Sequence, residues 1–242
     1  MSFFSDKIRK AHHSFCSAVV VAAGKSERMG ADKLLMELRG KPVLAHTLTA
    51  LNQCGAVDEI VVVTRPDLLE AVAQMKTEYM IGKLNKIVLG GKTRTESALA
   101  GVSETSRDAK IICIHDGARP FVTGAVIEDA VHHAVLYHAA APAVPLKDTV
   151  KSAADGIVTG TPDRSTLFAV QTPQAFEADI IKAALTKAVQ DGKTFTDDCA
   201  AVEALGVQVH LSEGSEENLK ITTPADLVTA EAIMKRWGGR PV

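Results

Sequence analysis

The 242-residue chain lacks any run of 18 apolar residues, which excludes a transmembrane helix. It also lacks a strong charge of either sign, because 27 Lys and Arg residues stand against 29 Asp and Glu residues, for a net charge of -2. A protein that coats nucleic acid would be strongly basic, so we expect neither a nucleic-acid nor a membrane partner. With 46% hydrophobic residues, the chain can bury a large core as one domain spanning residues 1–242.

Cysteine is scarce, and Cys16, Cys54, Cys113 and Cys199 lie far apart without the CxxC or Cys/His spacing of a metal site. Cys16 and Cys113 fall in apolar, strand-like runs, so we predict buried thiols and a reducing, cytoplasmic location. Lys7, Arg9 and Lys10 precede an apolar run at residues 15–23, and this combination resembles a signal peptide. We favour a first β-strand there, because the run is β-branched and ends in a charged glycine loop.

Short apolar runs alternate with helical patterns along most of the chain. Strands are predicted at 17–23, 59–64, 86–89, 110–115, 139–144, 168–170, 207–211 and 219–222, and helices at 42–53, 66–76, 93–105, 124–138, from about 177, and at 197–205. A last helix opens at the capping box Thr223–Asp226. This alternation predicts an α/β, Rossmann-like fold: a mostly parallel sheet with helices on both faces.

The pattern is interrupted by a polar stretch at residues 145–167. Asp155-Gly156 is a turn signal there, flanked by Val150 and by Ile157. We therefore predict a projecting β-arm inserted into the single domain.

The first motif directly follows the first predicted strand. Ala22, Ala23 and Gly24 are small enough for backbone amides to approach a phosphate, and Arg28 and Lys33 supply positive charge. The loop matches neither a Walker loop nor GxGxxG. An ordinary loop with solvated charges is the alternative, and we favour phosphate binding.

Two further motifs follow later strands. Paired glycines, Gly90 and Gly91, precede Arg94 and Ser97, which lie one helical turn apart and can face one ligand; Thr93 as a plain helix cap is an equally good reading. The segment 115–120 ends another strand, where open α/β sheets bind ligands. Its aspartate, Asp116, can hold Mg²⁺ or serve as a turn residue, and we expect its neighbour His115 to be a hydrogen-bonded strand-end histidine. For Thr196-Asp197-Asp198 we prefer a threonine helix cap over a metal site.

Together these blocks resemble the 2-C-methyl-D-erythritol 4-phosphate cytidylyltransferase family, from about Ser17 to the final helix. The similarity continues through residues 145–151, 163–164, 171–176 and 218–222. It implies a fold of the nucleotide-diphospho-sugar transferase type and transfer of CMP from CTP to 2-C-methyl-D-erythritol 4-phosphate, with release of pyrophosphate. It also implies Mg²⁺ or another divalent cation, held by Asp116, and a homodimer formed through the arm.

The resemblance carries roles over to individual residues. Catalysis falls to Arg28, Lys33 and Lys220, nucleotide binding to Ala22, Ala23, Gly24, Gly90, Gly91, Arg94, Ser97 and Asp116, and the second substrate to Asp116, Arg119, Thr149, Arg164 and Thr172. Thr149 and Arg164, on the arm, would serve the neighbouring subunit's site. The chain departs from the family at Ser26, where glycine is common.

Other readings stay open at this point. A ribitol-5-phosphate cytidylyltransferase is very similar, although Ala118 favours the methylerythritol enzyme. A non-catalytic nucleotide-binding regulator is a different class, and it need not keep Arg28, Lys33, Asp116 and Lys220 together. Many family members carry a fused second enzyme; because the sequence ends at Val242, we expect the single-function form. Since the attacking phosphate oxygen is already ionised, no general base is required.

Overall fold

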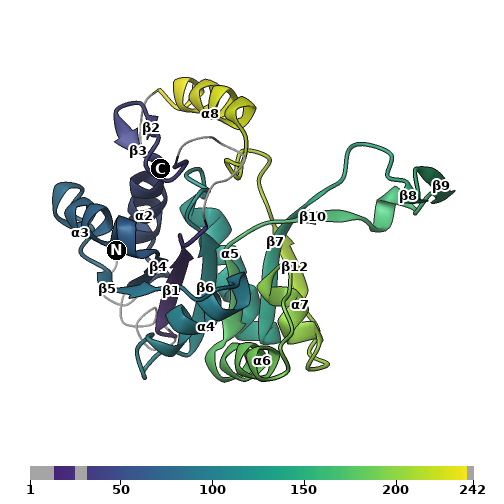
Figure 1. The fold of residues 1–242 in the computed structure, drawn as a ribbon, viewed down its shortest axis with the longest axis horizontal. Helices are drawn as coiled ribbons and strands as arrows, with labels where there is room; N and C mark the ends of the chain where they lie inside the picture. Colours follow the sequence, from purple (N-terminus) through teal and green to yellow (C-terminus); the bar gives the residue numbers. More distant parts are fainter. Residues whose placement is uncertain (1–13, 25–31, 239–242) are drawn as a thin grey trace, which may run out of the picture.

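The structure is built around an eight-stranded sheet (Figure 1). The computed structural model describes residues 14–24 and 32–238, so Ser26 and Arg28 lie outside the described residues. The strands of the sheet are β1 (Cys16–Val21), β4 (Glu59–Thr64), β5 (Leu84–Leu89), β6 (Ile111–Asp116), β7 (Ala139–Pro145), β10 (Phe168–Val170), β11 (Gln174–Glu177) and β12 (His210–Glu213). β10 and β11 run antiparallel to the other six, which confirms the prediction of a mostly parallel sheet.

The central strand is β1, which pairs with β4 on one side and β6 on the other. Val21 lies opposite Val63 of β4 and opposite Asp116 of β6, so these three parallel strands end side by side. β5 extends the sheet beyond β4, while β11 lies between β6 and β7, and β12 pairs with the far side of β7. The loops that follow β1, β4 and β6 therefore meet at one edge, the edge where open α/β sheets bind ligands.

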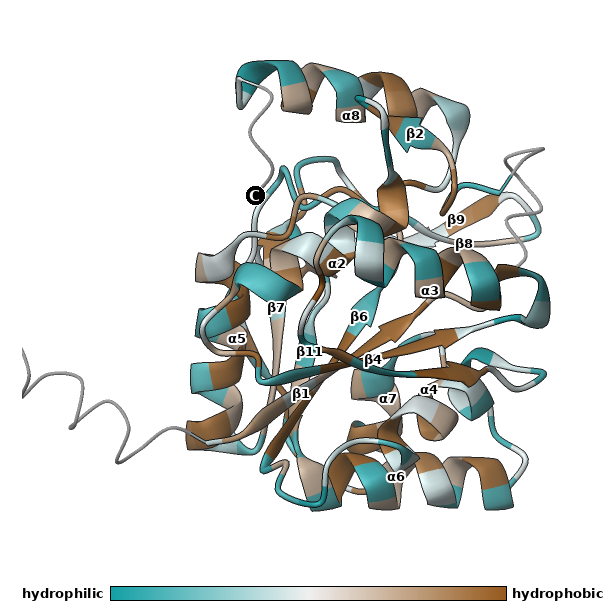
Figure 2. Ribbon diagram, turned by 90° about the vertical axis from the view of Figure 1, so that its left-hand side faces the viewer, coloured by the Kyte–Doolittle hydropathy of each residue, from teal (hydrophilic) through white to brown (hydrophobic). Residues whose placement is uncertain are grey.

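Helices cover both faces of the sheet, as predicted (Figures 1 and 2). α2 (Val43–Gln53), α3 (Leu69–Glu78) and α5 (Gly124–Tyr137) pack on one face, and α4 (Arg94–Ser103), α6 (Ala178–Gln190) and α7 (Asp198–Glu203) on the other. Along β1, Ala18 and Val20 join the first core and Val19 joins the second. This two-sided burial explains why the strand reads as a continuous apolar run.

A third, smaller apolar cluster lies above the sheet and fixes the last helix. There α8 (Pro224–Arg236) packs against the short hairpin of β2 (Glu37–Leu38) and β3 (Lys41–Pro42), as Figure 2 shows. Leu38, Phe121 and Ile233 belong to this cluster. The predicted capping box forms, since the Asp226 carboxylate accepts the Thr223 backbone N–H at 2.8 Å. In the described ranges no helix is long and apolar enough to cross a membrane.

Several predicted elements were wrong in place or kind. Residues 219–222 do not form a strand, and their link to the fold includes a backbone bond from Ile221 N to Ala118 O at 2.9 Å. The strand predicted at 207–211 begins only at His210. The predicted helix 66–76 opens with the 3-10 turn η1 (Pro66–Leu68). The antiparallel strand β11 was not predicted at all.

The polar stretch 145–167 projects from the sheet as an arm (Figure 1). Its tip is a hairpin of β8 (Ser152–Ala154) and β9 (Ile157–Gly160), followed by the 3-10 turn η2 (Arg164–Thr166). Asp155 and Gly156 have φ angles of 50° and 78°, the left-handed geometry of a tight hairpin turn, as predicted. Val150 precedes the hairpin rather than belonging to it.

Candidate active site

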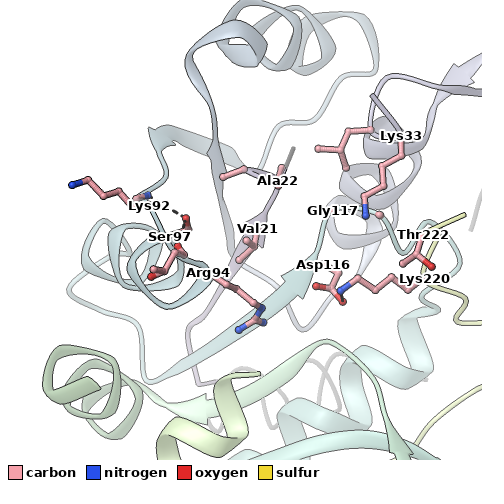
Figure 3. Close-up of a pocket in the computed structure, with 16 residues that line it drawn as sticks. Val21, Ala22, Lys33, Lys92, Arg94, Ser97, Asp116, Gly117, Lys220 and Thr222 are labelled. Carbon is pink, nitrogen blue, oxygen red and sulfur yellow. Dashed lines mark hydrogen bonds and ion pairs between the residues drawn. The ribbon is translucent and has the colours of Figure 1, made fainter. Parts of the chain in front are cut away.

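A cavity of about 900 Å³ opens where β1, β5 and β6 end (Figure 3). Its walls are Val21, Ala22, Ala23, Gly24, Lys33, Leu34, Gly91, Lys92, Thr93, Arg94, Ser97, Asp116, Gly117, Ala118, Lys220 and Thr222. These residues come from five segments of the described chain, at 21–24, 33–34, 91–97, 116–118 and 220–222, and they include nine of the predicted site residues. The three predicted motifs thus meet in one place.

Small residues make the wall beside β1. The Ala22 amide continues the sheet by donating to Val63 O at 2.7 Å, and the Gly117 amide donates to Val21 O at 3.0 Å. A Cβ at Gly117 would lie 3.3 Å from both the Ala22 Cβ and the Val21 oxygen. Because Ala22 and Gly117 are small, the ends of β1 and β6 lie close together and no large side chain fills the cavity beside them.

The paired glycines after β5 serve the loop itself as well as the cavity. The Gly91 amide donates to Ser97 Oγ at 3.1 Å, and that hydroxyl donates to Thr93 O at 2.8 Å. A Cβ at Gly90 would lie 2.6 Å from the Ala23 Cβ. Thr93 is the N-cap of α4, within a capping box closed by Glu96. Both readings of this motif therefore hold: the helix is capped, and its first turn lines the cavity.

Arg94 enters the cavity wall as half of a buried ion pair. Its guanidinium donates to both carboxylate oxygens of Asp198, at 2.8 and 2.6 Å, and the Asp198 side chain is only 1% exposed. Burial would lower the pKa of Arg94, but the hydrogen bonds and charge of Asp198 outweigh it and raise the pKa. The arginine is therefore charged and already neutralised by its partner, so it adds a fixed donor edge more than free positive charge.

Asp116 lies between two cations at the end of β6. Its Oδ2 is 3.1 Å from Arg119 Nε and 3.1 Å from Lys220 Nζ. Burial would raise the pKa of the carboxyl group, but the charges of Lys220 and Arg119 outweigh it and lower the pKa to about 2. Figure 3 shows Lys220 extended toward Asp116, with Lys33 on the same side of the cavity.

His115 is a structural residue, as predicted. It is fully buried, with Nδ1 3.0 Å from Thr172 Oγ1 and Nε2 3.3 Å from Arg119 O. Burial lowers its pKa to about 4, so the ring is neutral at pH 7. Thr172 also accepts the Asp116 amide at 3.1 Å, which makes this buried threonine a brace behind the cavity.

Asn218, two residues before Lys220, lies in a hydrogen-bond network that the sequence motifs do not predict. Asn218, 1% exposed, donates through Nδ2 to Thr172 O at 2.9 Å and to Gln171 Oε1 at 3.2 Å. The backbone carbonyl of Asn218 accepts from Arg119 Nη1 at 2.7 Å. A single asparagine thus joins two predicted site residues, Thr172 and Arg119. The resemblance to the family at residues 218–222 pointed to this segment, but it did not predict the hydrogen bonds that Asn218 makes.

Gly90, Arg119 and Thr172 adjoin lining residues without lining the cavity themselves, and two other predicted substrate residues lie away from it on the arm. Thr149 and Arg164 are exposed on the arm, and Arg164 Nη1 donates to Lys147 O at 2.6 Å. Within this subunit they do not reach the walls formed by the described residues. Arg28 lies outside the described residues.

The acidic residues near α7 have other roles than predicted. Asp197, not Thr196, is the N-cap of α7, because its carboxylate accepts the Ala200 amide at 3.0 Å. Asp198 is the partner of Arg94, a contact across 104 positions that local spacing gives no sign of. One local signal points to a separate role for Asp198: Asp197 alone is sufficient to cap α7, so a second aspartate directly after it is not needed for capping.

The donor set for a divalent cation is sparse. No group of three or more His, Cys, Asp or Glu side chains that could hold a metal occurs within residues 14–24 and 32–238. Asp116 is the one carboxylate in the cavity wall formed by these residues, and both of its ion pairs use Oδ2. A single carboxylate fits Mg²⁺, which is commonly held by one or two carboxylates with water and substrate phosphates completing its shell.

The sheet, with its edge cavity of small-residue loops and fixed cations, defines an α/β nucleotidyltransferase. Comparison with known families identifies it further. The model of the family "2-C-methyl-D-erythritol 4-phosphate cytidylyltransferase" matches residues 16–236. The chain belongs to this family, and the predicted resemblance is confirmed.

Individual relatives agree with the family match. A protein of that name from Caldanaerobacter subterraneus is 45% identical over 224 residues, covering 91% of this chain and 99% of the relative. One from Halalkalibacterium halodurans is 44% identical over 220 residues, covering 90% and 96%. The crystal structure of 4-diphosphocytidyl-2C-methyl-D-erythritol synthase from Anaerococcus prevotii superposes with a TM-score of 0.83 at 30% identity, covering 93% of this chain and all of that one.

Proposed function

We propose that the protein transfers CMP from CTP to 2-C-methyl-D-erythritol 4-phosphate, releasing pyrophosphate and forming 4-diphosphocytidyl-2-C-methyl-D-erythritol. One observation carries the proposal: the described residues of the family motifs, at 22–24, 33, 91–97, 116–118 and 220–222, line the same cavity. The family match over residues 16–236 supports the choice of nucleotide and acceptor.

The reaction needs placement and charge rather than a proton acceptor. The attacking group is a phosphate oxygen that is already ionised at neutral pH, and it displaces pyrophosphate from the α-phosphorus of CTP. Catalysis then depends on in-line positioning and on stabilising the negative charge of the transition state. The neutral His115 and the strongly acidic Asp116 agree with this, because neither is poised to exchange protons near pH 7.

Each wall of the cavity has a proposed part in binding. The small residues 22–24 and the loop at Gly91 would face the nucleotide, with Ser97 and Arg94 supplying fixed polar edges. Lys33 and Lys220 would meet the phosphates, and Arg28 would join them from the segment 25–31. Asp116 would orient Lys220 through their 3.1 Å contact.

Asp116 would also hold Mg²⁺, which when bound supplies positive charge to the phosphates of CTP. Its pKa of about 2 keeps the carboxylate ionised across the physiological range, as a metal ligand requires.

A substrate matrix tests the proposed function. Pyrophosphate release is measured with CTP, ATP, GTP and UTP, each combined with 2-C-methyl-D-erythritol 4-phosphate and with ribitol 5-phosphate. We expect turnover with CTP and the methylerythritol phosphate, because small residues and backbone groups at the nucleotide wall can read the edge of a pyrimidine, whereas a purine would overfill the space. Equal turnover with ATP would contradict the nucleotide assignment, and faster turnover with ribitol 5-phosphate would contradict the acceptor. Binding of CTP without turnover would identify a regulator.

A further inference from the structure

Arg65 lies one residue beyond β4, and its side chain joins two separated pieces of backbone beside the cavity. Its Nη1 donates to Gly24 O at 2.8 Å, and its Nη2 donates to the Asp32 carboxylate. Its Nε donates to both carboxylate oxygens of Asp67, at 2.9 and 2.8 Å. The side chains of Arg65 and Asp32 are 19% and 17% exposed, whereas that of Asp67 is 65% exposed.

The contact to Asp32 continues directly to Lys33. While Asp32 Oδ2 receives Arg65, Oδ1 accepts the Leu34 amide at 3.1 Å. The Asp32 carbonyl also accepts the amides of Leu35 and Met36, at 3.0 and 3.1 Å. The backbone of Lys33 is thus enclosed in a turn whose first residue is held by Arg65. Lys33 itself lines the cavity.

The charge of Arg65 is already committed. Two carboxylates, Asp32 and Asp67, pair with its one guanidinium, and Arg65 is not among the cavity walls formed by the described residues. It is therefore placed as a brace and not as a phosphate ligand. Gly24, Asp32 and Asp67 are each bound by a different nitrogen of the planar guanidinium, whereas all three N–H groups of a lysine sit on one nitrogen and cannot be spread over the same distance.

We propose that Arg65 is a positioning residue for this site, which holds Gly24 and Asp32 at a fixed separation and thereby sets where Lys33 enters the cavity. The role rests on the proposed function, in which Lys33 meets the phosphates of the nucleotide. Arg65 lies 33 positions along the chain from Asp32 and 41 positions from Gly24, so no local sequence motif indicates this role.

A mutant cycle tests this role. The variants are Arg65→Gln, Asp32→Asn, Lys33→Ala and the double variant Arg65→Gln/Lys33→Ala, with Asp67→Asn as the matched control. Asp67→Asn removes the same charge as Asp32→Asn but leaves the Gly24 and Asp32 contacts in place. For each variant, kcat and the KM for CTP and for the acceptor are measured by pyrophosphate release, and folding is checked by thermal unfolding.

We expect Arg65→Gln and Asp32→Asn to lower kcat/KM by roughly 10-fold to 100-fold, the scale of a misplaced catalytic group. Asp67→Asn should stay within about twofold of wild type, as exposed substitutions usually do. Once Lys33 is alanine, Arg65→Gln should change the rate by no more than about twofold, because the residue it positions is gone. A merely structural arginine would not depend on Lys33 in this way.

The proposal fails if Arg65→Gln is as active as wild type, if Asp67→Asn loses as much activity, or if the Arg65 and Lys33 effects multiply. If Arg65→Gln does not fold, Asp32→Asn decides, because it breaks the same contact from the other side. An inactive wild type would contradict the proposed function, and a fully active Lys33→Ala would contradict the part assigned to Lys33. Wild-type activity in folded Arg65→Gln, beside an impaired Lys33→Ala, would contradict the positioning role alone.

Discussion

Asp116 and His115, adjacent on β6, are held in different charge states at neutral pH. Asp116 is ionised, with a pKa of about 2, because the charges of Lys220 and Arg119 outweigh its burial. His115 is neutral, with a pKa of about 4, because burial disfavours its protonated form. Asp116 keeps a negative charge that attracts Lys220 at the edge of the cavity. His115 stays uncharged and contributes hydrogen bonds that support the end of the strand.

His115 should make the fold sensitive to acid. An unfolded chain takes up this proton near pH 6.5, whereas the folded chain resists until about pH 4, so stability falls as the pH drops through that window. The full effect amounts to about 3 kcal/mol, at 1.36 kcal/mol per pKa unit. Denaturant unfolding of wild type and His115→Gln from pH 7.5 down to pH 4 covers this window. The variant should show a flatter dependence on pH, and parallel curves would exclude His115 as the source.

Lys33 should act chiefly on the transition state. We expect Lys33→Ala to lower kcat far more than it raises the KM for the acceptor, at a loss of roughly 2–4 kcal/mol, by analogy with a lost oxyanion donor. Lys187→Ala, an exposed lysine on α6, is the matched control and should leave both constants unchanged. If kcat of Lys33→Ala stays within about threefold of wild type, the lysine is not catalytic.

For single residues, the sequence predicted those that belong to a local motif, but it did not predict which distant residues they contact. Ala22, Gly91 and Asp116 stand at strand ends, where a local pattern is sufficient evidence. Asp198 could not be assigned in that way, because its partner Arg94 is 104 positions away and is brought to it only by packing of helices. The roles of Asn218 and Arg65 were hidden for the same reason.

Among the elements, α4 and α7 are joined across the sheet face by the Arg94–Asp198 ion pair. Asp198→Ala would leave the Arg94 charge without its buried partner. Because Arg94 is 27% exposed, we expect the lower end of the range for breaking a buried pair, about 3 kcal/mol. That corresponds to a fall in Tm of roughly 6–12 °C for a chain of this size.

The exposed pair of Lys86 and Glu104 is the matched control for this prediction. Both side chains are about half exposed, at 49% and 50%, so Glu104→Ala should cost less than about 1 kcal/mol. Differential scanning calorimetry of the two variants compares the pairs directly. Equal shifts in Tm would show that burial adds nothing to the Arg94–Asp198 contact.

Element boundaries were predictable where the pattern is local and strong. Glu59–Thr64 and Phe168–Val170 were predicted with the bounds they have. β11 was missed, since the four residues Gln174–Glu177 carry no β-branched side chain and owe their strand to pairing with β6 and β7. Conversely, residues 219–222 alternate like a strand but do not join the sheet, so the segment stays a loop that presents Lys220.

For the whole molecule, the arm is the segment that projects furthest from the sheet, with apolar side chains exposed near its tip (Figure 1). Its tip leaves Ile157 and Val158 exposed by 71% and 56%, and Phe168 on the adjoining β10 by 43%. Apolar side chains on a projecting hairpin have little to pack against in their own chain. A second subunit would cover them, and the predicted single domain with a dimerisation arm would then become part of a homodimer.

Arm exchange makes a quantitative prediction about mixed dimers. If Arg164 serves the neighbouring site, then Arg164→Ala and Lys33→Ala proteins should each be nearly inactive alone. In a heterodimer of the two, one site carries both defects and the other carries neither. Random mixing places half of the chains in heterodimers, each with one intact site of two, so activity should recover to about one quarter of wild type per chain.

The measurement mixes the two variants under dissociating conditions, restores native buffer and follows pyrophosphate release, with heterodimer content determined by native mass spectrometry. Two Arg164→Ala preparations mixed in the same way are the control and should recover nothing. If heterodimers form and activity stays at the level of the parents, Arg164 acts within its own subunit or not at all. A monomer in light scattering of the wild type would contradict the arrangement sooner, since Thr149 and Arg164 would then have no second cavity to enter.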